Sequence, residues 1–122
     1  MAASGLSDRL QLLPPTTEVA RALSAFDLIL LTSKWEGTPN VAIEAQAVGT
    51  PIVLTGGGAK EAIAHGTSGI CVEQPDAHAI AEAAVRMLAA EIGMTHWIAV
   101  NFVNERFAMS RMIKRPRSVY GL

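Results

Sequence analysis

Two glutamates in the first half of the chain are the residues whose type and spacing best suit chemistry. Glu36 and Glu44 have seven residues between them, among which are a glycine, a proline and an asparagine. A carboxylate can accept hydrogen bonds from two hydroxyl groups, such as those of a sugar or a ribose. The free N–H groups of a helix N-terminus can hold a phosphate oxygen. The pattern therefore indicates a ligand that carries both hydroxyls and phosphate.

A strand, a loop and a helix are predicted around these glutamates. The apolar run over residues 26–32 is too short for a buried helix and predicts a strand. Thr38 is suited to the N-cap of the next helix and Pro39 to its first position, and Gly49 ends it. The loop between strand and helix lies at the carboxyl end of the strand, where ligands of open α/β sheets bind.

The first turn of this helix supplies the groups that could hold phosphate. The backbone N–H groups of Thr38, Asn40 and Val41 lack partners inside the helix. Glu44 lies about a turn and a half along the helix, so Glu44 and Glu36 would meet different parts of one ligand. Taken one by one, however, the two glutamates are better explained as a loop charge and an exposed helix residue.

The rest of the chain alternates predicted strands with predicted helices. Further strands are expected over residues 9–13, 51–55 and 70–72, and further helices over residues 17–25, 60–64, 77–90 and 95–113. Thr16 or Thr17 is suited to cap the first of these helices, and Asp76 is suited to cap the third. The strands are continuous apolar runs, which indicates burial on both faces and hence a parallel sheet. The fold class is therefore α/β, a Rossmann-like open parallel sheet with right-handed crossovers.

The composition excludes several classes of protein. The 122 residues form one domain at most, and half of them are apolar, so the chain can fill a core. The net charge of −1 gives no basic face for a nucleic acid. No apolar run reaches the roughly 18 residues of a membrane span, and no signal peptide is recognised. A cytoplasmic location is expected.

The cysteine and the histidines do not form a metal site by spacing. Cys71 is the one cysteine and lies in an apolar run, so it is expected to be an inert buried thiol. His65, His78 and His96 have no metal-ligand spacing and no paired cysteines beside them. We therefore expect no bound metal.

The sequence around the two glutamates resembles the C-terminal domain of a GT-B fold glycosyltransferase of the glycosyl transferases group 1 family, also called family 4. The resemblance covers residues 5–122. It rests on five segments, which are residues 27–33, 35–40, 44–53, 66–69 and 104–108.

The resemblance implies a role for each residue of the glutamate segment. Glu36 would be catalytic and would bond hydroxyls of the donor sugar, and Glu44 would hold the donor ribose. The backbone of five residues would line the sugar and the diphosphate: Gly37, Thr38, Pro39, Asn40 and Val41. The implied enzyme is retaining, transfers a sugar from a nucleotide-sugar to an acceptor, and uses no metal and no further cofactor. Lipid-linked acceptors are common in the family and would bring a complete enzyme to a membrane.

The family also carries parts that residues 1–122 do not match. Those parts are an N-terminal acceptor domain and the first two βα units of the C-terminal domain. We therefore expect a partial donor-binding domain with its early strands missing, and no transferase activity from these residues alone. The strand at 28–32 would then have an open apolar edge, so we expect self-association or pairing with a separate N-terminal chain.

Two other hypotheses stay open at this point. The chain could be a non-catalytic remnant or nucleotide-binding module that keeps the acid pair. A dehydrogenase-like dinucleotide site would use Gly56 and Gly58, but Glu61 stands where the third glycine of that motif belongs.

Overall fold

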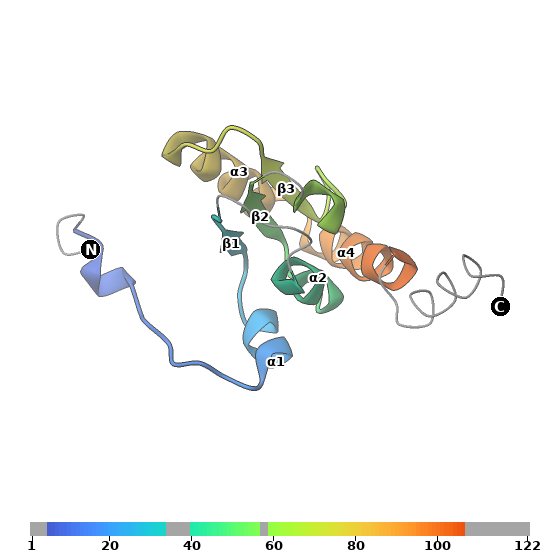
Figure 1. Cartoon of the computed structure of the whole chain (residues 1–122), viewed down its shortest axis with the longest axis horizontal. Coiled ribbons are helices and arrows are strands. Elements are labelled where there is room, and N and C mark those ends of the chain that lie inside the picture. The colour runs from blue at the N-terminus through green and yellow to red at the C-terminus, as the bar shows by residue number, and fades with distance from the viewer. Residues whose placement is uncertain (1–4, 34–39, 57–58, 107–122) are drawn as a thin grey trace, which may run out of the picture.

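The computed structural model of the chain describes residues 5–33, 40–56 and 59–106 (Figure 1). The elements follow one another as η2 (Ser7–Arg9), α1 (Val19–Ser24), β1 (Ile29–Leu31), α2 (Asn40–Ala47), β2 (Ile52–Thr55), η3 (Ala59–Ala62), β3 (Gly69–Val72), α3 (Ala77–Ala89) and α4 (Ile92–Arg106). Strands alternate with helices, as the sequence predicts.

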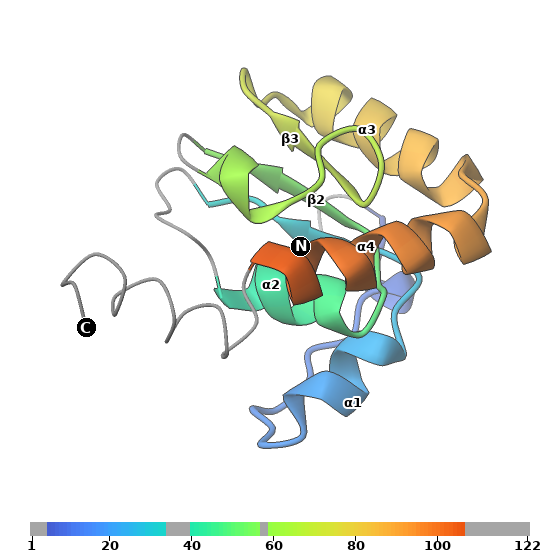
Figure 2. The ribbon, with the colours of Figure 1, turned by 90° about the vertical axis from the view of Figure 1, so that its right-hand side faces the viewer.

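The three strands form one parallel sheet in the order β1-β2-β3. Ile29 pairs with Ile52 across β1 and β2, and Ile52 pairs in turn with Gly69 of β3. Helix α2 packs on one face of the sheet with α4 beside it, and α3 packs on the other face (Figure 2). The predicted α/β class and the parallel sheet are confirmed.

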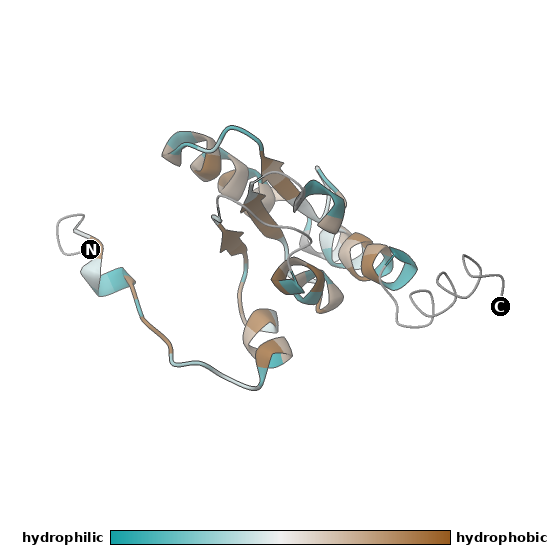
Figure 3. Ribbon diagram, viewed as in Figure 1, coloured by the Kyte–Doolittle hydropathy of each residue, from teal (hydrophilic) through white to brown (hydrophobic). Residues whose placement is uncertain are grey.

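Strand β2 lies at the centre and is buried on both faces. Ile52 and Leu54 point to the cluster that contains Ala42 and Ala45 of α2. Val53 points to the opposite cluster, on the α3 side. Successive side chains of a strand alternate between faces, so a strand covered on both sides is apolar throughout. Figure 3 shows the three strands as the most apolar part of the chain.

Local sequence signals correctly predict several helix boundaries. Asp76 caps α3, because its Oδ1 accepts a hydrogen bond from the Ala79 N–H at 2.7 Å. Such a cap satisfies an N–H group that the helix leaves free. Gly49 follows α2 with a φ of 80°, the left-handed conformation that ends many helices. Helix α4 begins at Ile92, three residues before the predicted start.

The strand predicted over residues 9–13 is wrong. The 3-10 helix η2 ends at Arg9, and no helix or strand lies between Leu10 and Glu18. Leu10, Leu12 and Leu13 are exposed. A strand gains its hydrogen bonds only from a neighbouring strand, and within the described residues none lies beside this segment. Figure 1 shows the segment running apart from the sheet before it reaches α1.

Helix α1 is shorter than predicted and is tied to the body by one buried hydrogen bond. Thr50 Oγ1 donates to the Leu23 carbonyl oxygen at 2.8 Å. Thr16 Oγ1 accepts from the Glu18 N–H at 3.0 Å, just ahead of the helix, so the polar residue predicted to start α1 acts before the first turn.

Gly49 is constrained twice, by its backbone and by its neighbour. A side chain at a φ of 80° is strained wherever it stands. A Cβ built on Gly49 would also lie 1.8 Å from Nδ1 of His96, so the imidazole ring of α4 occupies the space that a side chain would need. Gly66 has a similar φ of 87° but nothing within 4 Å of its Cβ position.

Gly49→Ala should therefore destabilise the chain much more than Gly66→Ala. The left-handed backbone alone costs about 1–2 kcal/mol, which is the loss expected at position 66. At position 49 the clash adds to that cost, for a total of about 3 kcal/mol or more. Urea unfolding followed by circular dichroism measures both. Adding His96→Ala to Gly49→Ala should recover the part that is due to the clash, and equal losses in the two single variants would contradict this account.

Candidate functional site

The structure describes three of the seven sequence-predicted site residues. Asn40, Val41 and Glu44 all lie on α2, and all three are exposed. Helix α2 follows β1, so its first turn lies at the side of the sheet where the strands end (Figure 2). Glu36, Gly37, Thr38 and Pro39 fall outside the described residues.

A buried hydroxyl joins the ends of β1 and β2. Thr55, the last residue of β2, donates its Oγ1 hydrogen to the Ser33 carbonyl oxygen at 2.8 Å. Ser33 is the last described residue before the predicted loop. The hydrogen bond therefore fixes the point at which the chain leaves β1 towards Glu36.

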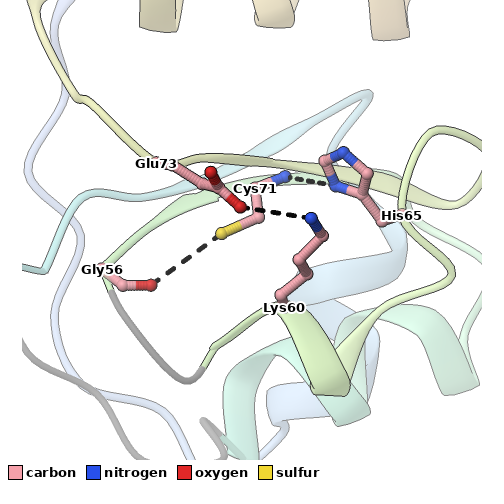
Figure 4. A network of polar contacts seen from close by, with 5 residues as sticks. All are labelled: Gly56, Lys60, His65, Cys71 and Glu73. Atoms are coloured by element: carbon pink, nitrogen blue, oxygen red, sulfur yellow. Dashed lines mark hydrogen bonds and ion pairs between the residues drawn. The ribbon is translucent and has the colours of Figure 1, made fainter.

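Two opposite charges stand at the same end of the sheet, beyond β2 and β3. Lys60 Nζ in η3 lies 3.2 Å from Glu73 Oε1, which follows β3 (Figure 4). Both side chains are more than half exposed, so the pair contributes little to stability, about 0–1 kcal/mol. Lys60 is a cation on the side of the sheet where the predicted phosphate would bind, but in the structure its partner is Glu73.

His65 and Cys71 connect the turn before β3 to the strand itself. The Cys71 N–H donates to Nδ1 of His65 at 3.1 Å (Figure 4). Because Nδ1 accepts, the neutral ring carries its proton on Nε2. Cys71 Sγ lies 3.8 Å from the Gly56 carbonyl oxygen. The thiol is buried, as the sequence predicts.

Burial raises the pKa of the Cys71 thiol above its usual value. The negative charge of Glu73 raises this pKa further, and the positive charge of Lys60 opposes the increase. The thiol therefore stays protonated at neutral pH. A protonated, buried thiol is a poor nucleophile, which fits an inert core position.

A hollow lies at the other end of the sheet. It measures about 550 Å³ and is lined by residues that lead into β1 and β2, such as Phe26, Asp27 and Thr50, and by His96 of α4. The predicted site residues lie where the strands end, and this hollow lies where they begin. It is therefore not the site predicted from the two glutamates.

The described residues contain neither a metal cluster nor a membrane span. No group of three or more His, Cys, Asp and Glu side chains there is placed to hold a metal ion. No helix within those residues is both long and apolar enough to cross a bilayer.

Sequence reasoning missed two residues that join the elements of this site. Gln46 and Ser68 are fully buried, and their side chains are hydrogen-bonded to each other. Both stand inside segments of the family resemblance, yet a glutamine and a serine separated by 21 residues give no local signal of contact. The one available clue was a polar residue at an inward-facing position of an otherwise apolar helix face.

Comparison with known proteins gives matches along the whole chain. The family model described as "Glycosyl transferases group 1" matches residues 1–90. A D-inositol 3-phosphate glycosyltransferase of Salinispora tropica is 34% identical over 98% of this chain and 26% of its own length. An N-acetyl-alpha-D-glucosaminyl L-malate synthase of Bacillus anthracis is 37% identical over 94% of this chain and 31% of its own length.

A third relative and two solved structures agree with these matches. The Vi polysaccharide biosynthesis protein VipC/TviE of Salmonella typhi is 30% identical over 89% of this chain and 20% of its own length. Structures of Anabaena Alr3699/HepE in complex with UDP-glucose and with UDP match 99% of this chain with TM-scores of 0.77 and 0.84. At 23% and 21% identity they establish the fold, and this chain covers 35% of each. The chain thus spans about a fifth to a third of the length of its relatives.

Cys71 gives a test of the geometry at the carboxyl end of β3. Its raised pKa and its burial should make alkylation by iodoacetamide at pH 8 slower in the folded chain than in urea, by about tenfold or more. Because the pKa is raised, the rate in the folded chain should still be climbing above pH 9. The chain has one cysteine, so mass spectrometry of the whole protein measures the rate. Equally fast labelling with and without urea would contradict this structure.

Proposed function

The chain belongs to the glycosyl transferases group 1 family, and from this premise we propose that it is the donor-binding part of a retaining glycosyltransferase. A nucleotide-sugar binds where β1 and β2 end, and its sugar passes to an acceptor. One observation supports the proposal most. Asn40, Val41 and Glu44, the predicted donor residues that the structure describes, lie together and exposed on α2, at the end of the sheet where the strands end. All three lie within the residues that match the family.

The residues of α2 take separate parts of the donor in this proposal. The backbone N–H groups of Asn40 and Val41, in the first turn, donate hydrogen bonds to diphosphate oxygens, and the helix dipole favours the negative charge there. Glu44 accepts hydrogen bonds from the two ribose hydroxyls. Glu44 is exposed, so no buried contact of its side chain has to be broken before the ribose binds.

The Anabaena structures support the choice of ligand class. They share the fold and contain UDP or UDP-glucose. A nucleotide-sugar also combines the hydroxyls and phosphates that the glutamate segment indicates. We propose a nucleoside diphosphate sugar as the donor.

Glu36 is proposed as the catalytic residue, which bonds hydroxyls of the transferred sugar. A double displacement would require a nucleophilic carboxylate about 5.5 Å from a partner acid. Glu36 and Glu44 are assigned to the sugar and to the ribose, so they do not form such a pair. A front-face reaction with retention is therefore proposed, in which donors aimed at the diphosphate stabilise its growing negative charge.

Residues 1–122 alone are not expected to complete this reaction. They span a fifth to a third of the relatives, and the acceptor site is expected in the part they do not match. Lys60 lies beside Glu73, whose negative charge offsets the positive charge that Lys60 could offer to the leaving diphosphate. This small coverage favours one second candidate, a nucleotide-binding module that binds the donor without turnover.

Substitution of the two glutamates tests the proposed roles. Glu44→Ala removes a charge-assisted hydrogen bond worth roughly 1.5–3 kcal/mol, so in any complete protein that contains these residues the nucleotide-sugar affinity should fall about 10- to 150-fold. Ligand-observed NMR with UDP-, GDP- and ADP-sugars measures the affinity and identifies the base. Glu82→Ala, an exposed glutamate on the outer side of α3, is the matched control and should leave the affinity unchanged.

Glu36→Ala should lower turnover more than binding in a protein that contains these residues and an acceptor domain. Its partner is the transferred sugar, so the contact strengthens in the transition state. Equal loss of binding in Glu36→Ala and Glu44→Ala, with unchanged turnover of bound donor, would refute this division of roles. Donor binding with no turnover in any such protein would favour the binding module.

Within the described residues, no strand pairs with the outer edge of β1. We also propose that this open edge binds a further strand, from a second copy or from a separate chain. The Ile29 N–H donates to the Pro51 carbonyl oxygen beside β2 at 3.0 Å. Neighbouring backbone groups of a parallel strand point to opposite sides, so Leu30 directs its N–H and C=O to the open edge. The Leu30 side chain is 52% exposed, and an open apolar edge is a template for pairing.

Sedimentation velocity over a range of concentrations tests this edge. The wild-type chain should form dimers or larger species as its concentration rises. Leu30→Lys should shift it to monomer, because a charge at an edge strand opposes pairing. Val85→Lys makes the same change at a 65% exposed residue of α3, away from the edge, and should not alter association. A wild-type chain that stays monomeric and compact throughout would refute association through this edge.

A further inference from the structure

Gln46 lies fully buried on α2, two residues after Glu44, and every hydrogen-bonding position of its amide is occupied. Nε2 donates to the Ala42 carbonyl oxygen at 3.0 Å and to the Ala62 carbonyl oxygen. Oε1 accepts from Ser68 Oγ at 2.5 Å and from the Ala64 N–H at 3.4 Å. Two carbonyl groups accept from the nitrogen of the amide, and two donors lie beside its oxygen. These partners fix the orientation of the amide, because a flipped amide would place its oxygen against the carbonyl groups.

Ser68 extends this set of hydrogen bonds towards β3. Its Oγ donates to Gln46 and accepts from the Ala64 N–H at 3.0 Å. Ser68 is fully buried and stands directly before Gly69, the first residue of β3. One glutamine and one serine thus join α2, the end of η3 and the start of β3.

The close approach that these bonds require comes from small residues. Ala42 and Ala45 of α2 and Ala62 of η3 are fully buried in one cluster. Larger side chains there would separate the two elements and leave the amide without partners. Inside a core, such hydrogen bonds are strong when complete, and an unpaired polar atom is costly.

The joined elements are the two that follow the carboxyl ends of β1 and β2. Helix α2 carries Asn40 and Glu44, and η3 carries Lys60. These elements therefore form two sides of the region where the donor is proposed to bind. Both elements also pack on the same face of the sheet, in the cluster that contains Ile52 and Leu54 of β2. Apolar contacts have no direction, so this packing alone does not fix their separation and orientation.

We propose that Gln46, together with Ser68, is a positioning residue that sets the separation and orientation of α2 and η3, and through them the geometry of the donor site. This inference rests on the proposed function for its ligand. Neither side chain needs to touch the donor. Gln46 acts by holding Glu44 on one side and the segment after β2 on the other.

Gln46→Met is the variant that tests this role, because methionine has a similar length and no amide. Thr50→Val is its matched control, since it also removes one buried side-chain hydrogen bond from the region around α2, but one that goes to Leu23 of α1 and not to the segment after β2. NMR measures two quantities in each variant: amide hydrogen exchange, and the orientation of η3 relative to α2 from residual dipolar couplings. Both variants are compared with the wild-type chain under conditions where all are fully folded.

In Gln46→Met, the Ala64 amide should exchange about tenfold faster relative to the Val53 amide in β2, and the orientation of η3 should change. In Thr50→Val, both amides should shift by the same factor and the orientation should stay as in wild type. An unchanged orientation of η3 in Gln46→Met would overturn the inference. If that variant does not fold, Ser68→Ala, which removes one hydroxyl and keeps the amide, provides the same comparison.

Donor affinity separates this inference from the proposed function. Where the wild-type chain binds a nucleotide-sugar, Gln46→Met should bind it about tenfold more weakly, and Thr50→Val should bind it equally well. Equal affinity in all three chains would overturn the role of Gln46 in the site. No binding by the wild-type chain would count against donor binding by these residues, and the exchange and orientation measurements would still decide whether Gln46 positions the two elements.

Discussion

The double-sided burial of β2 is the constraint on which the rest of the structure depends. Its four side chains are at most 2% exposed. Ile52 and Leu54 anchor the layer that contains α2, and Val53 anchors the layer that contains α3. With apolar surface worth about 25 cal/mol per Å² buried, a strand that serves two cores contributes to both layers at once. The parallel arrangement then sends every strand end, with its loop, to the same edge of the sheet.

That arrangement leaves polar backbone to be satisfied where the chain leaves the sheet. Side chains donate hydrogen bonds to such backbone carbonyl groups at three places. Thr55 donates to Ser33, Gln46 donates to Ala62 in the segment after β2, and Thr50 donates to Leu23 near the end of α1. Within the described residues, no buried side-chain nitrogen or oxygen lacks a partner. Because α2 buries mainly alanines, its attachment depends on such hydrogen bonds more than α3 does, which buries Met87.

The parts predicted from the sequence are those that local signals determine. The apolar run of β2, the cap at Asp76 and the helix end at Gly49 each depend on a few neighbouring residues, and each was correctly predicted. Placement of Glu44 on a helix followed from the same kind of signal. The prediction of a strand over residues 9–13 was wrong, because a strand also needs a partner strand from a distant part of the sequence. The buried hydrogen bonds of Gln46 were not predicted, because its partners Ala62 and Ser68 lie 16 and 22 positions away in the sequence.

The size of the interactions on α2 explains why a donor site of this kind needs further parts. In the proposed site, a charge-assisted bond from Glu44 would contribute roughly 1.5–3 kcal/mol, and each N–H of Asn40 or Val41 would contribute a similar amount through its bond to phosphate. Even a millimolar complex requires about 4 kcal/mol after association has cost an estimated 4–15 kcal/mol in lost freedom. Contacts from α2 alone therefore leave little net affinity. The remaining free energy must come from groups beyond α2. Those groups contribute to affinity only if they and Glu44 are held at the separation that the donor requires. A rigid junction between α2 and the segment after β2 meets that requirement, because freedom removed during folding is not lost again when the donor binds.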